Sequence, residues 1–444
     1  MNSQIKNHKR FYIHTLGCKV NQYESQAMRE ILVKSGFKDC ISRDIADIYV
    51  VNTCTVTERA DRESRYWIGF FHKMNPNAKI VVTGCYMETN ADDVSFLPGV
   101  FRVLKNSEKN QIAEILDPEA KDPEAAFRSL RISDFKSHTK AFIKIQDGCE
   151  NTCSYCKVPL VRGYFKSRPI SDILDEAKDL IARGFKELVL TGICLGAWGK
   201  DMFPGAISKG AGIAGLGLVD VLRAVTELPG DFRVRLSSIE PKYVTDELIG
   251  FLARNKKMCK HLHIPLQSGD DEILGKMNRS YTSEAYQTLV NKIRANMEDI
   301  ALTTDVLIGF PGESDANFRN TIEFIKGMLP LRTHIFTFSR RKGTPAYGMA
   351  GEVKDTVLKK RFYDLNTAAL GASYVYRRKF LNEKLNVLVE TKRDKQSGLL
   401  MGYSDNYIKI LFQGPDELMK NIVPVRVEYM TLMLTVGAYA PNPS

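Results

Sequence analysis

Short apolar runs alternate with amphipathic stretches in the first quarter of the chain. Three runs rich in β-branched residues are each only a few residues long, namely Phe11–Leu16, Ile48–Val51 and Lys79–Thr83. Between the first two, Gln22–Ser35 places Ala27, Ile31 and Leu32 on one face at helical spacing. Apolar strands separated by helices are typical of a parallel sheet that is buried on both faces. We therefore expect an open parallel α/β sheet in this region.

The alternation of strands and helices resumes between residues 140 and 339. The expected strands are Ala141–Ile145, Leu188–Thr191, Phe232–Leu236, His261–Pro265, Leu302–Ile308 and His334–Phe338. The expected helices are Ile170–Arg183, Leu218–Leu228, Thr245–Ala253, Ser283–Met297 and Asp315–Met328. These strand–helix units are fewer than the roughly eight of a closed barrel, so the pattern predicts a partial, open (β/α)6 barrel.

The pattern changes again after Arg377. Short β-like runs separated by Gly, Asn and Pro follow at Leu385–Glu390, Leu399–Tyr403, Tyr407–Phe412 and Pro424–Met430. They predict a small all-β barrel or sandwich. The fold class is therefore α/β with a β tail, and we expect domains at residues 10–122, 135–371 and 374–440. A polar linker with prolines joins the first two at 117–137, and a Gly/Ala-rich insertion interrupts the second at 204–217.

Composition narrows the class of protein. Hydrophobic residues make up 44% of the 444 positions, which is ordinary for a globular protein. No run of roughly eighteen apolar residues is present, and Met1–Arg10 lacks an apolar core, so we expect neither a membrane span nor a secretory signal, and a cytoplasmic location. Lys and Arg number 63 against 52 Asp and Glu. The net charge of +11 suits a polyanionic partner such as RNA, but it is also compatible with an ordinary basic protein.

The nine cysteines are an odd number in a chain without signs of secretion, which favours metal ligation over disulfides. Cys149, Cys153 and Cys156 form a C-x3-C-x2-C run, called the loop triad below. Three thiolates can bind three irons of a four-iron cluster and leave the fourth iron open. A structural zinc site needs four ligands, and no further Cys or His stands at the usual spacing. The run therefore indicates an iron–sulfur cluster; the alternative is three unrelated core cysteines.

Three other cysteines each follow one of the expected N-terminal strands. Cys18, Cys54 and Cys85 are called the strand-end triad below. Residues just past the carboxyl ends of parallel strands line one crevice, so these thiols should converge. Gly17 and Gly84 suit tight turns where the backbone passes close to a bulky group. The alternative is that each cysteine packs as a small buried hydrophobe.

Several motifs around these cysteines resemble the methylthiotransferase family of radical S-adenosylmethionine enzymes. They are Thr15–Gln22, Asn52–Thr57, Gly84–Cys85, Gly148–Cys156, Val161–Gly163, Ser167–Pro169, His263–Gly269 and Asp305–Glu313. The resemblance covers nearly the whole chain, including a tail similar to the family's small RNA-binding (TRAM-like) domain. It implies two four-iron clusters, one on the loop triad that cleaves S-adenosylmethionine and an auxiliary one on the strand-end triad that carries the sulfur. The implied product has a methylthio group in place of a C–H hydrogen.

Within this family, Leu190–Gly196 and Arg340–Ala346 look most like the branch that acts on threonylcarbamoyladenosine next to the anticodon of tRNA, at carbon C2. That branch usually has His where Cys194 stands and lacks the Gly-rich insertion, and these departures bear on the substrate rather than on the clusters. Two alternatives keep the chemistry, with another modified adenosine or an aspartate of a ribosomal protein as the target. A third alternative is a non-catalytic RNA-binding protein stabilised by metal.

The resemblance also implies which residues surround S-adenosylmethionine. Tyr155 is expected near the adenine, and the other expected contacts are Gly192, Glu240, Gln267 and Leu307. Each has a structural alternative, since Glu240 before a proline could simply close a strand. His261 and His263 share one face of a strand, and we interpret them as satisfied core histidines rather than metal ligands.

The expected partners are the anticodon stem-loop of tRNA and an electron donor such as a flavodoxin or ferredoxin. The candidate RNA contacts are Arg340–Lys342, Arg377–Lys379, Tyr403, Tyr407 and Phe412. Arg162 and Arg168 lie near the loop triad in sequence and are expected to favour an anionic substrate. The alternative for all of them is ordinary: charge runs are usually solvated, and aromatic residues usually belong to the core.

Overall fold

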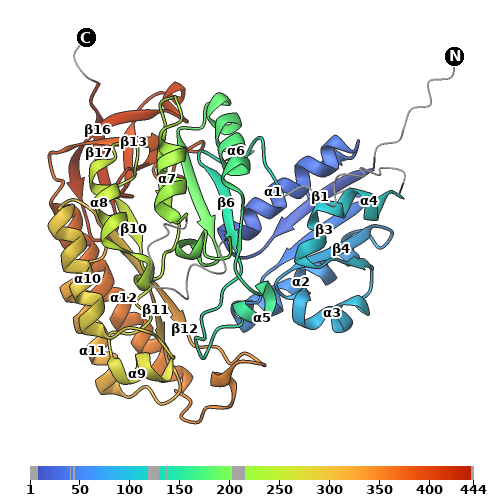
Figure 1. Cartoon of the computed structure of the whole chain (residues 1–444), viewed down its shortest axis with the longest axis horizontal. Helices are drawn as coiled ribbons and strands as arrows, with labels where there is room; N and C mark the ends of the chain where they lie inside the picture. Colours follow the sequence, from blue (N-terminus) through green and yellow to red (C-terminus); the bar gives the residue numbers. More distant parts are fainter. Residues whose placement is uncertain are drawn as a thin grey trace.

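The computed structural model describes residues 9–40, 42–43, 46–118, 130–135, 138–202 and 216–441. Within these ranges the chain forms an N-terminal parallel α/β sheet, a central curved array of parallel strands covered by helices, and a small C-terminal β-barrel (Figure 1). The expected fold class is therefore confirmed. Most of the expected linker and nearly all of the Gly/Ala-rich insertion lie outside the described residues. No described helix is both long enough and apolar enough to span a bilayer.

The N-terminal sheet has the strand order β2-β1-β3-β4-β5, and every pairing in it is parallel. Its strands are β1 (Arg10–Thr15), β2 (Lys38–Asp39), β3 (Ile48–Thr53), β4 (Lys79–Gly84) and β5 (Val100–Val103). Its helices are α1 (Lys19–Lys34), α2 (Glu58–Met74), α3 (Met87–Ser95) and α4 (Ile112–Leu116). The three apolar runs are the three central strands, and β3 is buried along its whole length. The helix expected at Gln22 begins three residues earlier, immediately after Cys18.

The central part contains six parallel strands in chain order. They are β6 (Ala141–Asp147), β8 (Glu187–Gly192), β9 (Arg233–Leu236), β10 (His261–His263), β11 (Ala301–Ile308) and β12 (Arg332–Thr337), with a short antiparallel edge strand β7 (Lys166–Ser167). A parallel bridge between Ser238 and His263 joins β9 to β10, so the two hydrogen-bonded sheets continue into one open barrel. The helices are α5 (Val158–Arg162), α6 (Ile170–Ala182), α7 (Leu218–Thr226), α8 (Asp246–Arg254), α9 (Asp271–Lys276), α10 (Ser283–Asn296), α11 (Asp315–Met328) and α12 (Asp355–Arg378).

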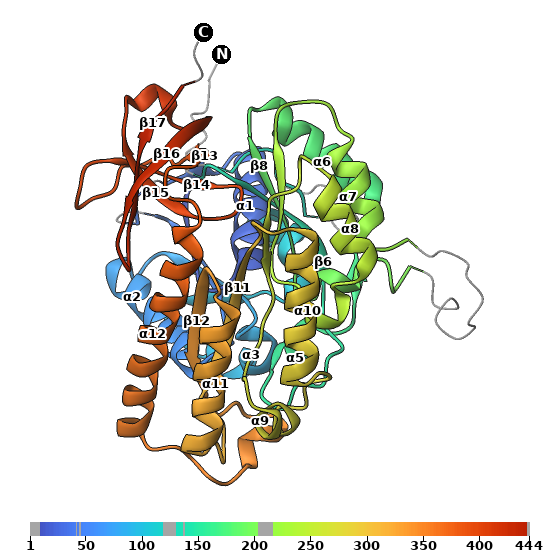
Figure 2. The ribbon, with the colours of Figure 1, turned by 90° about the vertical axis from the view of Figure 1, so that its left-hand side faces the viewer.

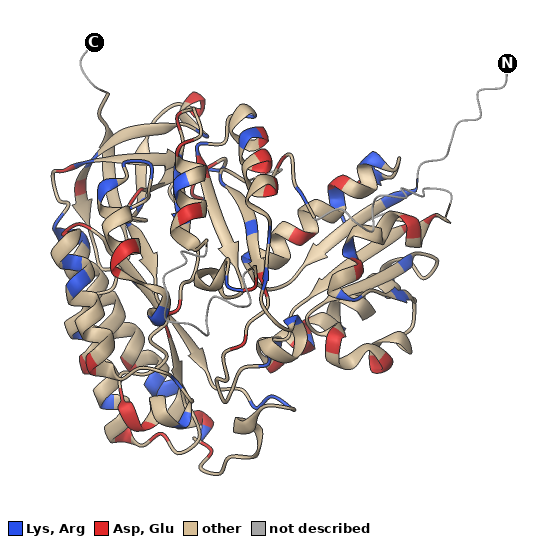
Figure 3. Ribbon diagram, viewed as in Figure 1, with Lys and Arg blue, Asp and Glu red and all other residues tan. Residues whose placement is uncertain are grey.

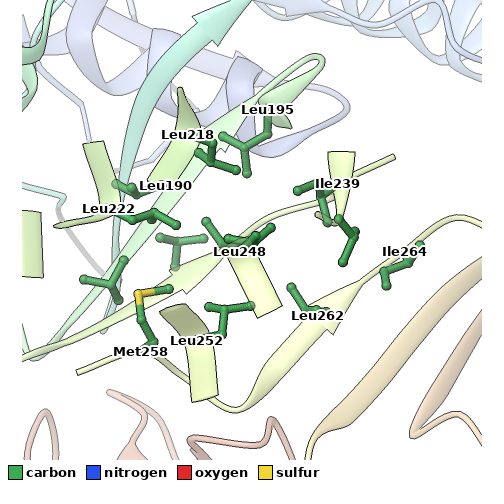
Figure 4. Close-up of a cluster of buried hydrophobic side chains, with 14 of the residues drawn as sticks. Leu190, Leu195, Leu218, Leu222, Ile239, Leu248, Leu252, Met258, Leu262 and Ile264 are labelled. Carbon is green, nitrogen blue, oxygen red and sulfur yellow. The ribbon is translucent and has the colours of Figure 1, made fainter. Parts of the chain in front are cut away.

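The core of this part lies between the strands and the outer helices. Figure 4 shows Leu190 of β8, Leu222 of α7, Leu248 of α8 and Leu262 of β10 converging in one apolar cluster. All four side chains are at most 1% exposed, and burying such a side chain contributes about 1.5–3 kcal/mol. Figure 2 shows α10, α11 and α12 side by side along the part of the array formed by β11 and β12.

The C-terminal part is a closed five-stranded barrel with the order β13-β14-β15-β17-β16. Its strands are β13 (Lys384–Val389), β14 (Leu400–Ser404), β15 (Lys409–Gln413), β16 (Ile422–Met430) and β17 (Thr435–Tyr439). Four of them are the expected strands, whereas β17 was not expected. Gly437 in β17 lies against β16, where an added Cβ would come within 2.3 Å of the Arg426 carbonyl oxygen. This close approach lets β17 pair with β16, and its further pairing with β15 closes the barrel.

A buried ion network fastens the N-terminal sheet to the central part. Glu24 of α1 accepts hydrogen bonds from Lys109, from Lys144 of β6 at 2.7 Å and from Arg162 of α5 at 2.6 Å. The side chains of Glu24, Lys109 and Arg162 are at most 1% exposed. Asp147, at the end of β6, also binds Lys144 at 2.6 Å. The partners of Glu24 come from both parts of the chain. Separating the two parts would therefore break these ion pairs and leave charged groups without partners.

Two further contacts cross the same boundary. The Tyr23 hydroxyl donates to the Leu130 carbonyl oxygen at 2.7 Å and lies 3.0 Å from a carboxylate oxygen of Glu176 on α6. Arg341 binds Asp61 of α2 and donates to the Thr55 hydroxyl at 2.7 Å. The N-terminal sheet is thus held at several separated points along one side of the open barrel.

Replacing Glu24 with Gln should destabilise the protein by about 3–5 kcal/mol, because it leaves three buried cations short of a counter-charge. Burial alone would raise the pKa of Glu24, but Arg162, Lys109 and Lys144 hold it well below its ordinary value. A carboxyl whose pKa is depressed by folding contributes stability above its unfolded pKa and loses it as the pH falls. The difference between wild type and variant should therefore be full above about pH 5 and shrink below about pH 4.

Urea denaturation followed by circular dichroism measures this difference. Glu63→Gln is the matched control, since Glu63 forms an exposed pair with Arg59 on α2 and its loss should cost less than about 1 kcal/mol. Equal effects of the two substitutions, or a difference that does not depend on pH, would contradict the assigned role of the network.

Candidate metal centres and cofactor site

The strand-end triad converges at the carboxyl edge of the N-terminal sheet. Cys18 caps α1 after β1, while Cys54 and Cys85 follow β3 and β4 and are 6% and 9% exposed. Gly17 has a φ of +91°, and an added Cβ would lie 2.8 Å from the Cys54 sulfur. Gly84 has a φ of +99°, and its Cβ would lie 2.3 Å from the Thr53 carbonyl oxygen. Only glycine fits these two turns, which bring the three loops together.

Two asparagines hold the loops of this triad. The Asn21 amide donates to the Leu16 carbonyl oxygen at 2.8 Å and to the Thr53 carbonyl oxygen at 2.9 Å, so it ties the β1 loop to the β3 loop. The Asn52 amide donates to the Asn21 carbonyl oxygen at 2.9 Å. Both side chains are at most 1% exposed. The triad therefore rests on a preorganised polar scaffold, not on mobile loops.

Arg162 connects this triad to the central part of the chain. Its Nε donates to the Cys85 sulfur at 3.2 Å, and its Nη2 donates to the Asn21 side-chain oxygen at 2.7 Å. The network around it holds Lys109, Lys144 and Arg162 against Glu24 and Asp147, which leaves one positive charge in excess. A cluster held by three thiolates carries net negative charge, so this surplus fits a cluster at the strand-end triad.

The loop triad follows β6, at the carboxyl face of the open barrel. Backbone hydrogen bonds fix its loop, from Cys149 N to the Gly163 carbonyl oxygen at 3.0 Å and from Cys156 N to the Cys153 carbonyl oxygen at 3.1 Å. Gly148 has a φ of +75°, and an added Cβ would fall 1.8 Å from the Tyr164 carbonyl oxygen. The loop is therefore pinned at both ends, with its three thiols partly exposed.

The thiols of the loop triad differ in how easily they ionise. A hydrogen bond with the Cys194 thiol lowers the pKa of Cys149 to about 7. Burial raises the pKa of Cys156 to about 12. Burial also raises the pKa of Cys153, although Arg279 opposes it by donating from Nη1 to the Cys153 sulfur at 3.1 Å. A metal would have to supply the stabilisation that keeps all three as thiolates.

The spacing of the sulfurs bears on which metal fits. Among the described His, Cys, Asp and Glu residues, neither cysteine triad has all its sulfurs within 4.8 Å of one another. Ligands at about 2.3 Å from a single tetrahedral zinc would lie closer together than that. A cubane separates its cysteine sulfurs more widely. Neither triad therefore has the close spacing that three thiolates on one zinc ion would have.

Of the residues expected around S-adenosylmethionine, Tyr155 and Leu307 come together beside the loop triad. Both belong to a small apolar cluster with Phe310, whose ring centroid is 6.4 Å from that of Tyr155. Leu307 is 8% exposed. Burial raises the pKa of Tyr155 well above its ordinary value, so the phenol stays neutral. These side chains form an apolar wall next to the cysteine loop.

The other three expected contacts lie at the same carboxyl face. Glu240 pairs with Arg279, and both line a cavity of about 120 Å³ together with Cys153. Gly192 ends β8, where an added Cβ would lie 3.0 Å from the Gln146 side chain. Gln267 has a φ of +67°, and its backbone bonds to β11 on both sides. The backbone of Gln267 is thus fixed by the sheet.

Two features of this face lack a sequence signal. Arg279, between α9 and α10, joins Cys153 to Glu240 but belongs to no motif that we recognised. Ser237 follows β9, and its hydroxyl is buried without a hydrogen-bond partner among the described residues. A buried hydroxyl of this kind suits a bound polar ligand. Together with the apolar wall, these groups fit a cofactor that has both polar and apolar parts.

The histidines of β10 lie deeper in the open barrel. The Thr303 hydroxyl forms two hydrogen bonds of 2.9 Å, one with Nε2 of His261 and one with Nδ1 of His263. His263 Nε2 also lies 3.1 Å from Asp305, and His334 brings a third ligand-type atom within 4.8 Å. His261 has the expected internal partner, whereas His263 belongs to a polar group that also has metal-ligand geometry.

Several candidate RNA contacts point inward. Arg162 and Arg168 are engaged in buried ion pairs with Glu24 and Glu176. Arg341 is bound to Asp61, Arg377 donates to four groups between Thr431 and Thr435, and Phe412 is fully buried. Tyr403 and Tyr407 stack on each other at 5.1 Å, and Lys140 and Arg235 lie over their rings. The expected exposure to RNA is therefore wrong for the buried arginines and for Phe412, whereas Tyr403 and Tyr407 are half-buried and line a cavity.

Charges of both signs occur along the outer helices. Figure 3 shows Lys and Arg interspersed with Asp and Glu along the outer helices. On α11, for example, Asp315 and Glu323 alternate with Arg319 and Lys326. Charges of both signs therefore alternate along this helix.

Comparison with known proteins matches two families. Residues 10–104 match the group described as "Uncharacterized protein family UPF0004", and residues 143–325 match the radical SAM superfamily. The second match implies a four-iron cluster and S-adenosylmethionine for the central part. In fold, the chain is similar to the radical S-adenosylmethionine methyltransferase TsrM from Kitasatospora setae, with a TM-score of 0.55 and 16% identity over 77% of both chains.

Curated relatives match nearly the whole length. The threonylcarbamoyladenosine tRNA methylthiotransferase MtaB of Bacillus subtilis is 35% identical over 93% of this chain and 92% of its own. The protein of the same name from Thermotoga maritima is 37% identical over 90% and 91%. The tRNA-2-methylthio-N(6)-dimethylallyladenosine synthase of Clostridium tetani is 34% identical over 94% and 93%. Relatives this similar over this length show that the chain belongs to the radical S-adenosylmethionine methylthiotransferase family.

Proposed function

We propose that this enzyme inserts a methylthio group at C2 of threonylcarbamoyladenosine next to the anticodon of tRNA. The two relatives of that name, at 35% and 37% identity, support the substrate. The observation that carries the reaction is that two cysteine triads lie at the carboxyl edges of two parallel sheets and are linked by one buried arginine. Arg162 follows the loop triad by six residues and donates to Cys85 of the strand-end triad.

The proposal assigns one four-iron cluster to each triad, with S-adenosylmethionine at the loop triad and the sulfur at the auxiliary cluster. When bound, the loop-triad cluster and S-adenosylmethionine supply a carbon radical that removes hydrogen from an unactivated C–H bond. Tyr155 and Leu307 exclude water from that region. Glu240, Gly192 and Gln267 border it from three neighbouring strand ends.

The arginines beside the sulfurs stabilise negative charge at both cysteine triads. Arg162 donates to Cys85, and Arg279 donates to Cys153. Hydrogen bonds to cluster sulfurs and local positive charge raise the reduction potential of an iron–sulfur cluster. Both guanidiniums are buried and are fixed by carboxylates, so they hold this effect constant during turnover.

We also propose binding partners, a cellular location and domain boundaries for this enzyme. We assign the anticodon stem-loop as the bound part of the tRNA, a flavodoxin or ferredoxin as the electron donor, and the cytoplasm as the site of action. We also assign the domains to residues 10–122, 135–371 and 374–440.

A second candidate substrate is dimethylallyladenosine in tRNA, which the 34% identity to the Clostridium tetani synthase supports. The match to the radical SAM superfamily and the similarity to curated methylthiotransferases argue against the non-catalytic alternative with structural zinc.

Cys149→Ala should abolish cleavage of S-adenosylmethionine, because a two-thiolate site would not hold the cluster that binds it. Cys54→Ala should retain cleavage but form no methylthiolated nucleoside. The measurements are 5′-deoxyadenosine and methylthio product by mass spectrometry, together with iron content. Wild type should contain about eight irons per chain and each variant about four.

Cys40→Ala is the matched control for both substitutions, since Cys40 lies outside both triads and should keep both activities. Methylthiolated product from either triad variant would refute the division of labour. Zinc without iron in the purified wild type would refute the enzyme itself.

Cells that lack the gene should lose 2-methylthio-threonylcarbamoyladenosine from bulk tRNA and keep the unmethylthiolated nucleoside. Nucleoside mass spectrometry of tRNA from deletion and complemented strains measures both. Selective loss of the methylthiolated dimethylallyl nucleoside would instead assign the second candidate substrate.

A further inference from the structure

A cavity lies where all three parts of the chain meet. It measures about 220 Å³, and its lining includes Lys19 of α1, Phe142 of β6, Arg235 of β9 and Tyr407 of the C-terminal barrel. Helix α1 packs against β6 and β8, which places its first turn at the open side of the central barrel (Figure 1). The first residue of that turn, Lys19, directly follows the strand-end Cys18.

The carboxylates of this cavity already have partners. Glu187 binds Arg233 at 2.7 Å and Arg235 at 2.8 Å. Glu390 accepts from the Thr139 hydroxyl at 2.6 Å and binds Lys140 at 3.4 Å. Among the residues that line the cavity, Lys19, Lys140 and Arg235 outnumber these two carboxylates by three to two. The cavity therefore has a surplus of positive charge.

Of the cations that line this cavity, Lys19 is the one without an ion pair among the described residues. Among the described residues, no carboxylate lies within ion-pair distance of its ammonium. Glu187, which lines the same cavity, already binds two arginines, and Arg235 and Lys140 are further cations of the lining. Its position at the N-terminal turn of a sixteen-residue helix adds further positive potential. A partly buried ammonium in such surroundings is stabilised by an anion from outside the chain.

The cavity also borders the inner strands of the central part, because its lining includes Phe142 of β6, Val189 of β8 and Arg235 of β9. An anion bound by Lys19 would therefore lie between the auxiliary triad and the inner wall of the barrel.

We propose that Lys19 binds the carboxylate of the threonylcarbamoyl arm on the target adenosine. This inference rests on the proposed function, which supplies a substrate with one carboxylate near the reacting carbon. A dimethylallyl arm carries no charge and would leave the ammonium unpartnered. Lys19 is thus a specificity-determining residue that holds the base beside Cys18. A phosphate of the RNA backbone has similar oxyanion chemistry and is the source that the experiment must distinguish.

The test measures binding of anticodon stem-loops to the iron-loaded enzyme by fluorescence anisotropy. One stem-loop carries threonylcarbamoyladenosine, and the other carries unmodified adenosine at the same position. Lys19→Met should weaken binding of the first by about 10- to 150-fold, the range for loss of a charged hydrogen bond. Binding of the second should be unchanged, because both share the same phosphates. Lys19→Arg should restore most of the preference.

Lys34→Met is the matched control, since Lys34 is exposed in the last turn of the same helix. Iron and sulfide contents of every variant check that the auxiliary cluster is intact. Equal weakening of both stem-loops would assign Lys19 to a backbone phosphate, and no weakening of either would remove it from the site; both results overturn the proposal. Wild type that binds both stem-loops equally would also overturn it, whereas wild type that prefers the first but forms no product would refute only the proposed reaction.

Discussion

The buried charges around Glu24 are the constraint on which the arrangement of this enzyme depends. Glu24 comes from the N-terminal sheet, while Lys144 and Arg162 come from the central barrel. Burying a carboxylate costs several kcal/mol, and only close cations with good geometry recover that cost. The two parts therefore have one docked position in which the carboxylates of Glu24 and Asp147 are both neutralised by cations. That position brings Arg162 to Cys85.

Parallel sheets explain why distant cysteines meet. Each strand of a parallel sheet ends at the same edge, so a cysteine just past each strand contributes to one site without any long-range sequence signal. Both cysteine triads follow the ends of parallel strands. The strand-end triad comes from three separate loops of the N-terminal sheet, and the loop triad comes from a single loop of the barrel. The first solution needs Asn21 and two glycines of positive φ to fix the loops. The second needs only a short loop that is anchored at Gly148 and Gly163.

The elements that sequence analysis predicted are those with strong local patterns. β3 is a run of apolar residues buried on both faces, and α11 begins at a capping box on Ser314, so both stand out in the chain. β17 does not, because its closure depends on a glycine that lets it approach β16. Likewise, the cysteines have motif spacing, whereas Arg279 meets Cys153 only through tertiary packing. The prediction that the basic runs contact RNA failed for the buried arginines, because the sequence does not show whether an arginine faces water or a buried carboxylate.

The C-terminal barrel is fastened to the central part at two places. Arg377, in the last turn of α12, donates to the carbonyl oxygens of Thr431, Leu432 and Leu434. Arg233 and Arg235 donate to the carbonyl oxygens of Asn386, Tyr403, Ser404 and Asp405. Two separate sets of hydrogen bonds therefore restrain the position of the barrel relative to the central part. An RNA that contacts both parts meets a rigid, preformed surface, and its affinity is not reduced by the entropy of ordering a loose domain.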